Sequence, residues 1–110
     1  MAATAAQAQG IQMDVIFGVV VRGRVQGVGY RAWAEITACE LGVAGWIRNC
    51  RDGSVEALFA GPKEVVLAMI ELCRQGPPGA RIDHLDQRAA RSEDLALRRR
   101  GELFSVLATV

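Results

Sequence analysis

Residues 23–33 read GRVQGVGYRAW, and in this stretch a strand pattern gives way to a helical one. Residues 15–25 are rich in β-branched side chains and almost continuously apolar at their start, which predicts a central strand. Over residues 30–41 apolar side chains recur at helical spacing, and Gly42 stands where a helix ends. The stretch therefore predicts a strand, a glycine-rich turn and a helix in direct succession.

The rest of the chain predicts further strands and a second helix. In chain order they are strands over 43–49 and 54–60, a helix over 61–76, and a strand from residue 82 to about 91. Asp52 and Gly53 form a hairpin turn signal between two of these strands. The order β-α-β-β-α-β is that of the ferredoxin-like, split βαβ pattern. The predicted class is α+β, a two-layer sandwich of an antiparallel sheet with two helices on one face. Residues 103–110, LFSVLATV, are typical of an extra C-terminal strand after a polar connection over 92–102.

The composition is that of a soluble globular protein, with 110 residues of which 51% are hydrophobic and 23% charged. This length predicts a single domain, which we place over 14–110, behind a flexible N-terminal tail over 1–13. The formal net charge of +1 gives no overall attraction to nucleic acid or to an anionic membrane. No apolar run approaches the ~20 residues of a membrane span, and the N-terminus lacks the features of a secretion signal. We expect a cytoplasmic monomer without nucleic-acid or membrane partners.

The metal-binding residue types are sparse. The chain has three cysteines, Cys39, Cys50 and Cys73, and a single histidine, His84. An odd number of cysteines without CxxC spacing argues against a disulfide framework and against a structural zinc site. We expect no metal and no other cofactor.

The glycine-rich turn has the features of an anion-binding site. Gly27 and Gly29 allow backbone conformations in which successive N–H groups point to one ligand, next to the free amides of a helix N-terminus. Arg31 stands at the helix start, where a cation is unfavourable unless an anion compensates it. Its guanidinium can bind phosphate through two hydrogen bonds. On spacing alone, however, the glycines fit a plain tight turn equally well.

The predicted topology brings a second polar residue to this turn. The first two strands are parallel and end at the same edge of the sheet, so the turn and Asn49 emerge together. With the third strand between them, they lie roughly 10 Å apart, enough for a phosphate-sized group and a water molecule. By itself Asn49 fits the start of a hairpin loop better than a catalytic site. The turn lacks the Lys-Ser/Thr of a P-loop and the full GxGxxG spacing, so neither nucleotide motif is indicated.

Two strings resemble the signature of the acylphosphatase family. GRVQGVGYR, residues 23–31, is similar to the family's Gly-x-Val-Gln-Gly-Val-x-Tyr/Phe-Arg string, and GWIRNCRDGSVE, residues 45–56, is similar to a second one. The resemblance covers residues 15–91 and implies metal-independent hydrolysis of acyl phosphates to a carboxylate and inorganic phosphate. Cys50 and Arg51 in the hairpin loop depart from the commonest family form and leave the substrate preference open.

The resemblance also implies roles for individual residues. Arg31 and Asn49 would be the catalytic residues, the first binding the phosphate and the second positioning the attacking water. The residues that would cradle the phosphate through their backbone amides are Gln26, Gly27, Val28, Gly29, Tyr30 and Arg31. We see no general base beside Asn49 in the sequence. Our hypothesis is that a phosphate oxygen of the substrate accepts the proton of the water.

Two other function classes compete with the hydrolase. The first is a non-catalytic module that holds carbamoyl phosphate or phosphate in the same cradle. The second is an RNA-binding domain of the same fold, which needs aromatic side chains on its strand faces. The third predicted strand, SVEALFA, lacks the corresponding string, and aromatic residues make up only 5% of the chain. We therefore disfavour RNA binding.

Overall fold

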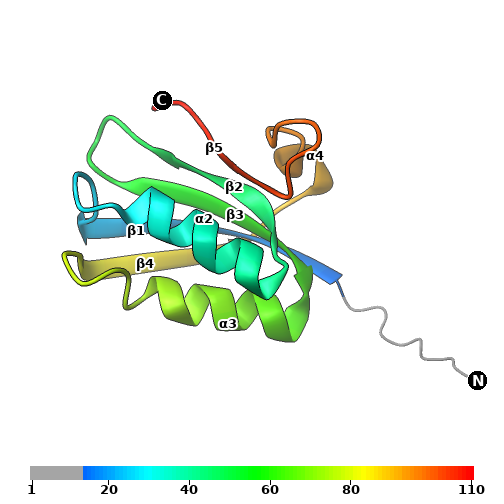
Figure 1. Cartoon of the computed structure of the whole chain (residues 1–110), viewed down its shortest axis with the longest axis horizontal. Helices are drawn as coiled ribbons and strands as arrows, with labels where there is room; N and C mark the ends of the chain where they lie inside the picture. The colour runs from blue at the N-terminus through cyan, green and yellow to red at the C-terminus, as the bar shows by residue number, and fades with distance from the viewer. Residues whose placement is uncertain (1–13) are drawn as a thin grey trace, which may run out of the picture.

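The computed structural model describes residues 14–110, in which two helices cover one face of a five-stranded sheet (Figure 1). The elements are β1 (Asp14–Arg24), α2 (Tyr30–Leu41), β2 (Ala44–Asn49), β3 (Val55–Pro62), α3 (Lys63–Cys73), β4 (Arg81–Ala89), α4 (Ser92–Leu95) and β5 (Phe104–Val106). The flexible tail expected over 1–13 lies outside the described residues. Within the described range, no helix is both long and apolar enough to cross a membrane. The predicted α+β, ferredoxin-like order of elements is confirmed.

The sheet has the strand order β4-β1-β3-β2-β5. β3 is antiparallel to both β1 and β2, so β1 and β2 run parallel to each other on either side of it. Val55 of β3 pairs with Val21 on one side and with Asn49 on the other. The ends of β1 and β2 therefore meet at one edge of the sheet, as the topology predicted.

The core lies between the sheet and helices α2 and α3. Alternate residues of the strands face the helices because side chains alternate across a sheet. The buried side chains of α2 are Tyr30, Ala34 and Ala38, one helical turn apart. The buried side chains of α3 are Val66, Met69, Ile70 and Cys73. The apolar stripe predicted for the first helix is shorter at its end than expected, because Leu41 is 37% exposed.

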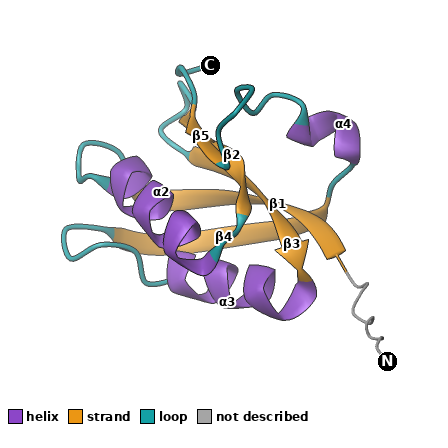
Figure 2. Cartoon of the chain, turned by 45° about the vertical axis from the view of Figure 1, so that its right-hand side comes forward, coloured by secondary structure: helices purple, strands orange, loops and turns teal. Residues whose placement is uncertain are grey.

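The other face of the sheet is partly covered by the segment after β4. Trp46 and Leu58 are buried there, and the indole N–H of Trp46 donates a hydrogen bond of 2.8 Å to the carbonyl of Asp94 in α4. Figure 2 shows α4 well apart from α2 and α3. The polar connection predicted over 92–102 thus contains a short helix that this tertiary contact anchors. The predicted last strand is confirmed only over Phe104–Val106, where it pairs in parallel with β2.

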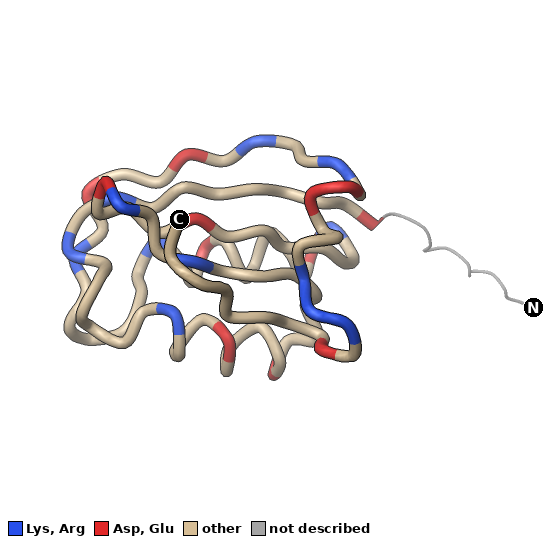
Figure 3. The backbone as a smooth tube through the Cα atoms, turned by 90° about the horizontal axis from the view of Figure 1, so that it is seen from above, with Lys and Arg blue, Asp and Glu red and all other residues tan. Residues whose placement is uncertain are grey.

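Charged residues of both signs are interspersed along the backbone (Figure 3). The outer strand β4 carries an ion pair of 2.9 Å between Arg81 and Asp83 and a contact of 2.9 Å between His84 and Asp86. Exposed charges on an edge strand disfavour its pairing with another strand.

Gly45 lies where β2 passes close to β3, and we expect its replacement to have a large effect on stability. Its φ is 148°, and a Cβ at this buried position would collide with the backbone carbonyl of Leu58. We expect Gly45→Ala to lower the free energy of unfolding by about 3 kcal/mol, through overpacking and backbone strain. Urea denaturation measures this value. The control is Gly101→Ala, at φ 85° with open space around it. Equal losses in the two variants would contradict the collision.

Candidate active site

The turn between β1 and α2 depends on two glycines in the left-handed region. Gly27 has φ 74° and Gly29 has φ 79°, conformations that other residues rarely adopt. Gly29 directly precedes α2, and no described side chain caps the N-terminus of this helix. The first turn of α2 also contains no acidic residue. The N–H groups that a helix leaves unpaired at its start are therefore free of a side-chain cap and suited to an anion.

Arg31 lies in the first turn of α2 and is half-buried. No described residue accepts a hydrogen bond from its guanidinium or pairs with it as an ion. By contrast, Arg22 pairs with Asp52 at 3.0 Å and Arg48 with Glu56 at 2.9 Å. A half-buried guanidinium beside a helix N-terminus concentrates positive charge in a site of reduced dielectric, which favours a bound anion.

Asn49 is the last residue of β2, and its backbone is held firmly. It pairs with Val55 of β3, and its carbonyl accepts a hydrogen bond of 3.1 Å from the N–H of Val110. Its side chain is different, because the Oδ1 atom is buried and has no hydrogen-bond partner among the described residues. A buried acceptor without a partner costs about 1–3 kcal/mol. The Asn49 carboxamide is therefore poised to accept a hydrogen bond from a bound molecule.

Arg31 and Asn49 line the same pocket, of about 360 Å³. Its lining residues are Val25, Gln26, Gly27, Gly29, Tyr30, Arg31, Ala32, Glu35, Asn49 and Val106. The structure thus brings together all the predicted site residues except Val28, whose side chain packs against the hydrophobic core. In the described part of the chain, no group of three or more His, Cys, Asp or Glu side chains is placed to hold a metal ion.

Tyr30 contributes to this pocket while its side chain anchors the helix. The ring is 2% exposed, and its hydroxyl donates a hydrogen bond of 2.7 Å to the carbonyl of Cys73 in α3. Burial raises the pKa of the phenol far above its usual value. The hydroxyl therefore stays protonated, and it fixes the start of α2 against α3.

Four lining residues were absent from the sequence prediction: Val25, Ala32, Glu35 and Val106. Glu35 lies four residues after Arg31, so both lie on one face of α2, and this spacing could have identified it. Val106 comes from β5, at the other end of the chain. No local pattern places that strand at the pocket.

Comparison with known proteins points to one family. The sequence model of acylphosphatases matches residues 17–97. An acylphosphatase from Bradyrhizobium diazoefficiens is 58% identical over 95 residues, which cover 86% of this chain and 96% of that relative. An acylphosphatase from Rhodopseudomonas palustris is 54% identical over 96 residues, 87% of this chain and 97% of the relative. The crystal structure of acylphosphatase from Bacillus subtilis has a TM-score of 0.73 at 31% identity, covering 84% of this chain and 98% of that one.

Proposed function

This chain belongs to the acylphosphatase family and hydrolyses acyl phosphates, and we propose that the pocket around Arg31 and Asn49 is where it does so. One observation carries the proposal: the buried Oδ1 of Asn49 and the guanidinium of Arg31, both without a partner among the described residues, line the same pocket. The phosphate group of an acyl phosphate supplies an anion for the Arg31 guanidinium. The water that attacks the phosphate supplies a hydrogen-bond donor for the Oδ1 of Asn49.

The phosphate is bound at the start of α2. The backbone amides of the turn over 26–31 and of the first helical turn donate hydrogen bonds to its oxygens. Arg31 adds a charge-assisted, two-pronged contact. These groups stabilise the charge on the equatorial phosphate oxygens as the transition state forms, which is the main protein contribution to phosphoryl transfer.

Asn49 positions the water. Its Oδ1 accepts a hydrogen bond from a water proton, and the water oxygen attacks phosphorus. The bond from phosphorus to the acyl oxygen breaks, and a carboxylate leaves without needing a proton. The second water proton goes to a phosphate oxygen of the substrate, so the products are a carboxylate and dihydrogen phosphate. Positioning and electrostatics suffice because the leaving group is good.

Hydrolysis of benzoyl phosphate, followed by ultraviolet absorbance in buffer with a chelator, tests this function. We expect rapid turnover that the chelator does not affect. Inorganic phosphate, as a product, is expected to inhibit competitively and to raise the melting temperature. The relatives do not favour the alternative of a non-catalytic phosphate-binding module. Stabilisation by phosphate without turnover would nevertheless support that module and overturn the proposed function.

Glu35 is one of the residues that line the pocket, so a role as a base can be tested directly. Because the substrate itself takes the proton, we expect Glu35→Gln to keep kcat for benzoyl phosphate within about threefold of wild type. For the same reason, kcat of the wild type is expected to stay flat between about pH 5 and 8. A hundredfold loss in Glu35→Gln, together with an acidic limb in the wild-type profile, would instead identify Glu35 as the general base.

We also propose that the protein acts as a monomer in the cytoplasm. The exposed charges of the edge strand β4 disfavour pairing with a second copy. Cys39, Cys50 and Cys73 are free thiols, as is usual in a reducing compartment. Sedimentation at the mass of one chain would support the monomer, and a dimer would overturn it.

A further inference from the structure

We propose that Gln26 is a positioning residue, whose carboxamide ties the phosphate-binding turn to the β2–β3 hairpin and so sets where Asn49 lies. This inference rests on the role proposed above for Asn49. It concerns the Gln26 side chain, whereas the cradle uses only the backbone of this residue.

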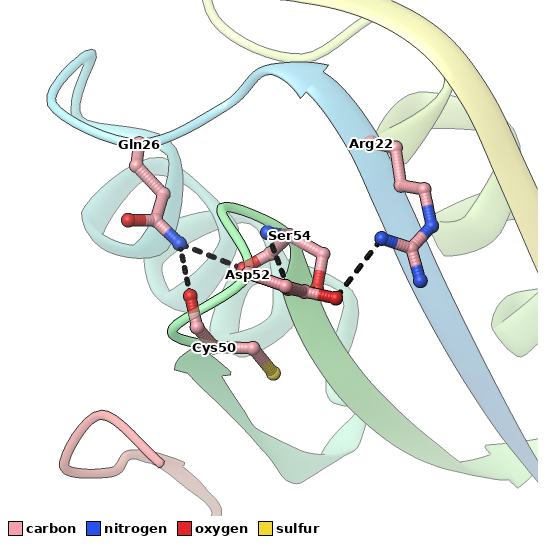
Figure 4. A network of polar contacts seen from close by, with 5 residues as sticks. All are labelled: Arg22, Gln26, Cys50, Asp52 and Ser54. Carbon is pink, nitrogen blue, oxygen red and sulfur yellow. Dashed lines mark hydrogen bonds and ion pairs between the residues drawn. The ribbon is translucent and has the colours of Figure 1, made fainter.

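The carboxamide of Gln26 bridges two segments that are far apart in the sequence. Its Nε2 donates hydrogen bonds of 2.8 Å to the carbonyl of Cys50 and of 2.8 Å to the carbonyl of Ser54 (Figure 4). Both partners are acceptors, so the group that faces them must be the NH₂ and not the carbonyl of the amide. Both hydrogens of this NH₂ are used, which fixes the orientation of the side chain.

The two carbonyls belong to the bonds that close the hairpin. The N–H of Cys50 donates to the carbonyl of Ser54 at 2.9 Å, and the N–H of Gly53 donates to the carbonyl of Cys50 at 3.1 Å. Gln26 therefore binds the hairpin at its most constrained point, next to Asn49 in the sequence. Since the Oδ1 of Asn49 has no partner among the described residues, the backbone must determine where the Asn49 side chain lies.

A second contact links β1 to the same hairpin on the surface. Asp52 accepts hydrogen bonds from the N–H of Ser54 at 2.9 Å and from its hydroxyl at 2.6 Å, and pairs with Arg22 of β1 at 3.0 Å. The Ser54 hydrogen bonds, followed by the contact with Arg22, lower the pKa of Asp52 to about 2. The carboxylate thus stays ionised between pH 5 and 8. Because the side chains of Arg22 and Asp52 are 51% and 54% exposed, this pair is weak, and the half-buried Gln26 provides the stronger link.

The test is the substitution Gln26→Met, which keeps the length of the side chain and removes both donors. A shift of about 1 Å at a positioned group can cost about 100-fold in rate, so we expect kcat for benzoyl phosphate to fall about 10- to 100-fold. The inhibition constant of inorganic phosphate is expected to change less than about threefold, because the amides and Arg31 remain. The matched control is Gln87→Met, at an exposed position in β4, with kcat within about twofold of wild type. A similar kcat in both variants would overturn the proposal.

A double-mutant cycle with Asn49→Ala shows whether Gln26 acts through Asn49. If it does, Gln26→Met lowers kcat by less than about threefold once Asn49 is alanine. If the two losses multiply, Gln26 acts independently and the proposal is wrong. Full activity of the single variant Asn49→Ala would instead refute the proposed role of Asn49, and this inference with it. Gln26→Glu, which has the same shape but no N–H donor, is the second variant should Gln26→Met not fold.

Discussion

Arg31→Gln is expected to lower kcat/KM for benzoyl phosphate by about 1000-fold, the loss that follows when a charged contact to a transition state is removed. Arg31 lines the pocket without a partner among the described residues, so its charge is available to the substrate phosphate. Glutamine keeps part of the side-chain volume and one hydrogen-bond donor group, but no charge. Steady-state hydrolysis, followed by ultraviolet absorbance, gives the value.

The inhibition constant of inorganic phosphate separates binding from other effects of this change. Arg31→Gln is expected to weaken phosphate inhibition by at least about tenfold, because a charge-assisted hydrogen bond contributes about 1.5–3 kcal/mol. Arg100→Gln, at an exposed position in the loop before β5, is the control and should match wild type. If Arg31→Gln hydrolyses benzoyl phosphate as fast as the control does, the phosphate is not bound at this arginine.

Asn49→Ala is expected to lower kcat about 100- to 1000-fold, as removal of a positioned amide does in other active sites. The KM is expected to change little, because the phosphate contacts remain. The stability of this variant, unlike its activity, is not expected to fall. The variant removes a buried acceptor that has no partner among the described residues, so the free energy of unfolding is expected to stay equal or to rise by about 1 kcal/mol.

This combination of lower activity and undiminished stability identifies a residue kept for function rather than for folding. Urea denaturation of Asn49→Ala beside wild type measures the stability, and Gln87→Ala serves as a control for the loss of an amide at an exposed position. A large loss of stability in Asn49→Ala would show that the side chain is structural, contrary to the proposed role. A kcat equal to that of the control would show that it does not position the water.

The site could be predicted from the sequence where its signals are local. Gly27 and Gly29 are needed for their positive φ, and Arg31 follows them at the helix start, so the strand, turn and helix are visible within one short stretch. The position of Asn49 beside the turn was predicted by a longer route, from the element order to two parallel strands that end at one edge, whereas its catalytic role came from the family resemblance. That inference holds because right-handed crossovers restrict the topology of such a chain.

Other features of the site depend on contacts across the fold. Val28 was predicted to offer its backbone amide to the cradle, and the structure adds that its side chain packs against the core. Val106 reaches the pocket only because β5 pairs with β2. The hydrogen bonds of Gln26 join residues 24 and 28 positions apart in the chain. Periodicity and turn signals describe a residue and its near neighbours, so they cannot reveal such partners.

The sequence by itself determined the order of the elements, and its resemblance to the acylphosphatase signature pointed to the two residues proposed to be catalytic. Helical and strand periodicity, glycine turns and charge at a helix start are properties of neighbouring residues, so they can be recognised before the fold is known. Only the tertiary structure decided that the Oδ1 of Asn49 is buried without a partner among the described residues and that Gln26 binds the hairpin beside it. Burial and hydrogen-bond partners are set when distant segments pack together, and that packing places the groups of this pocket around one site.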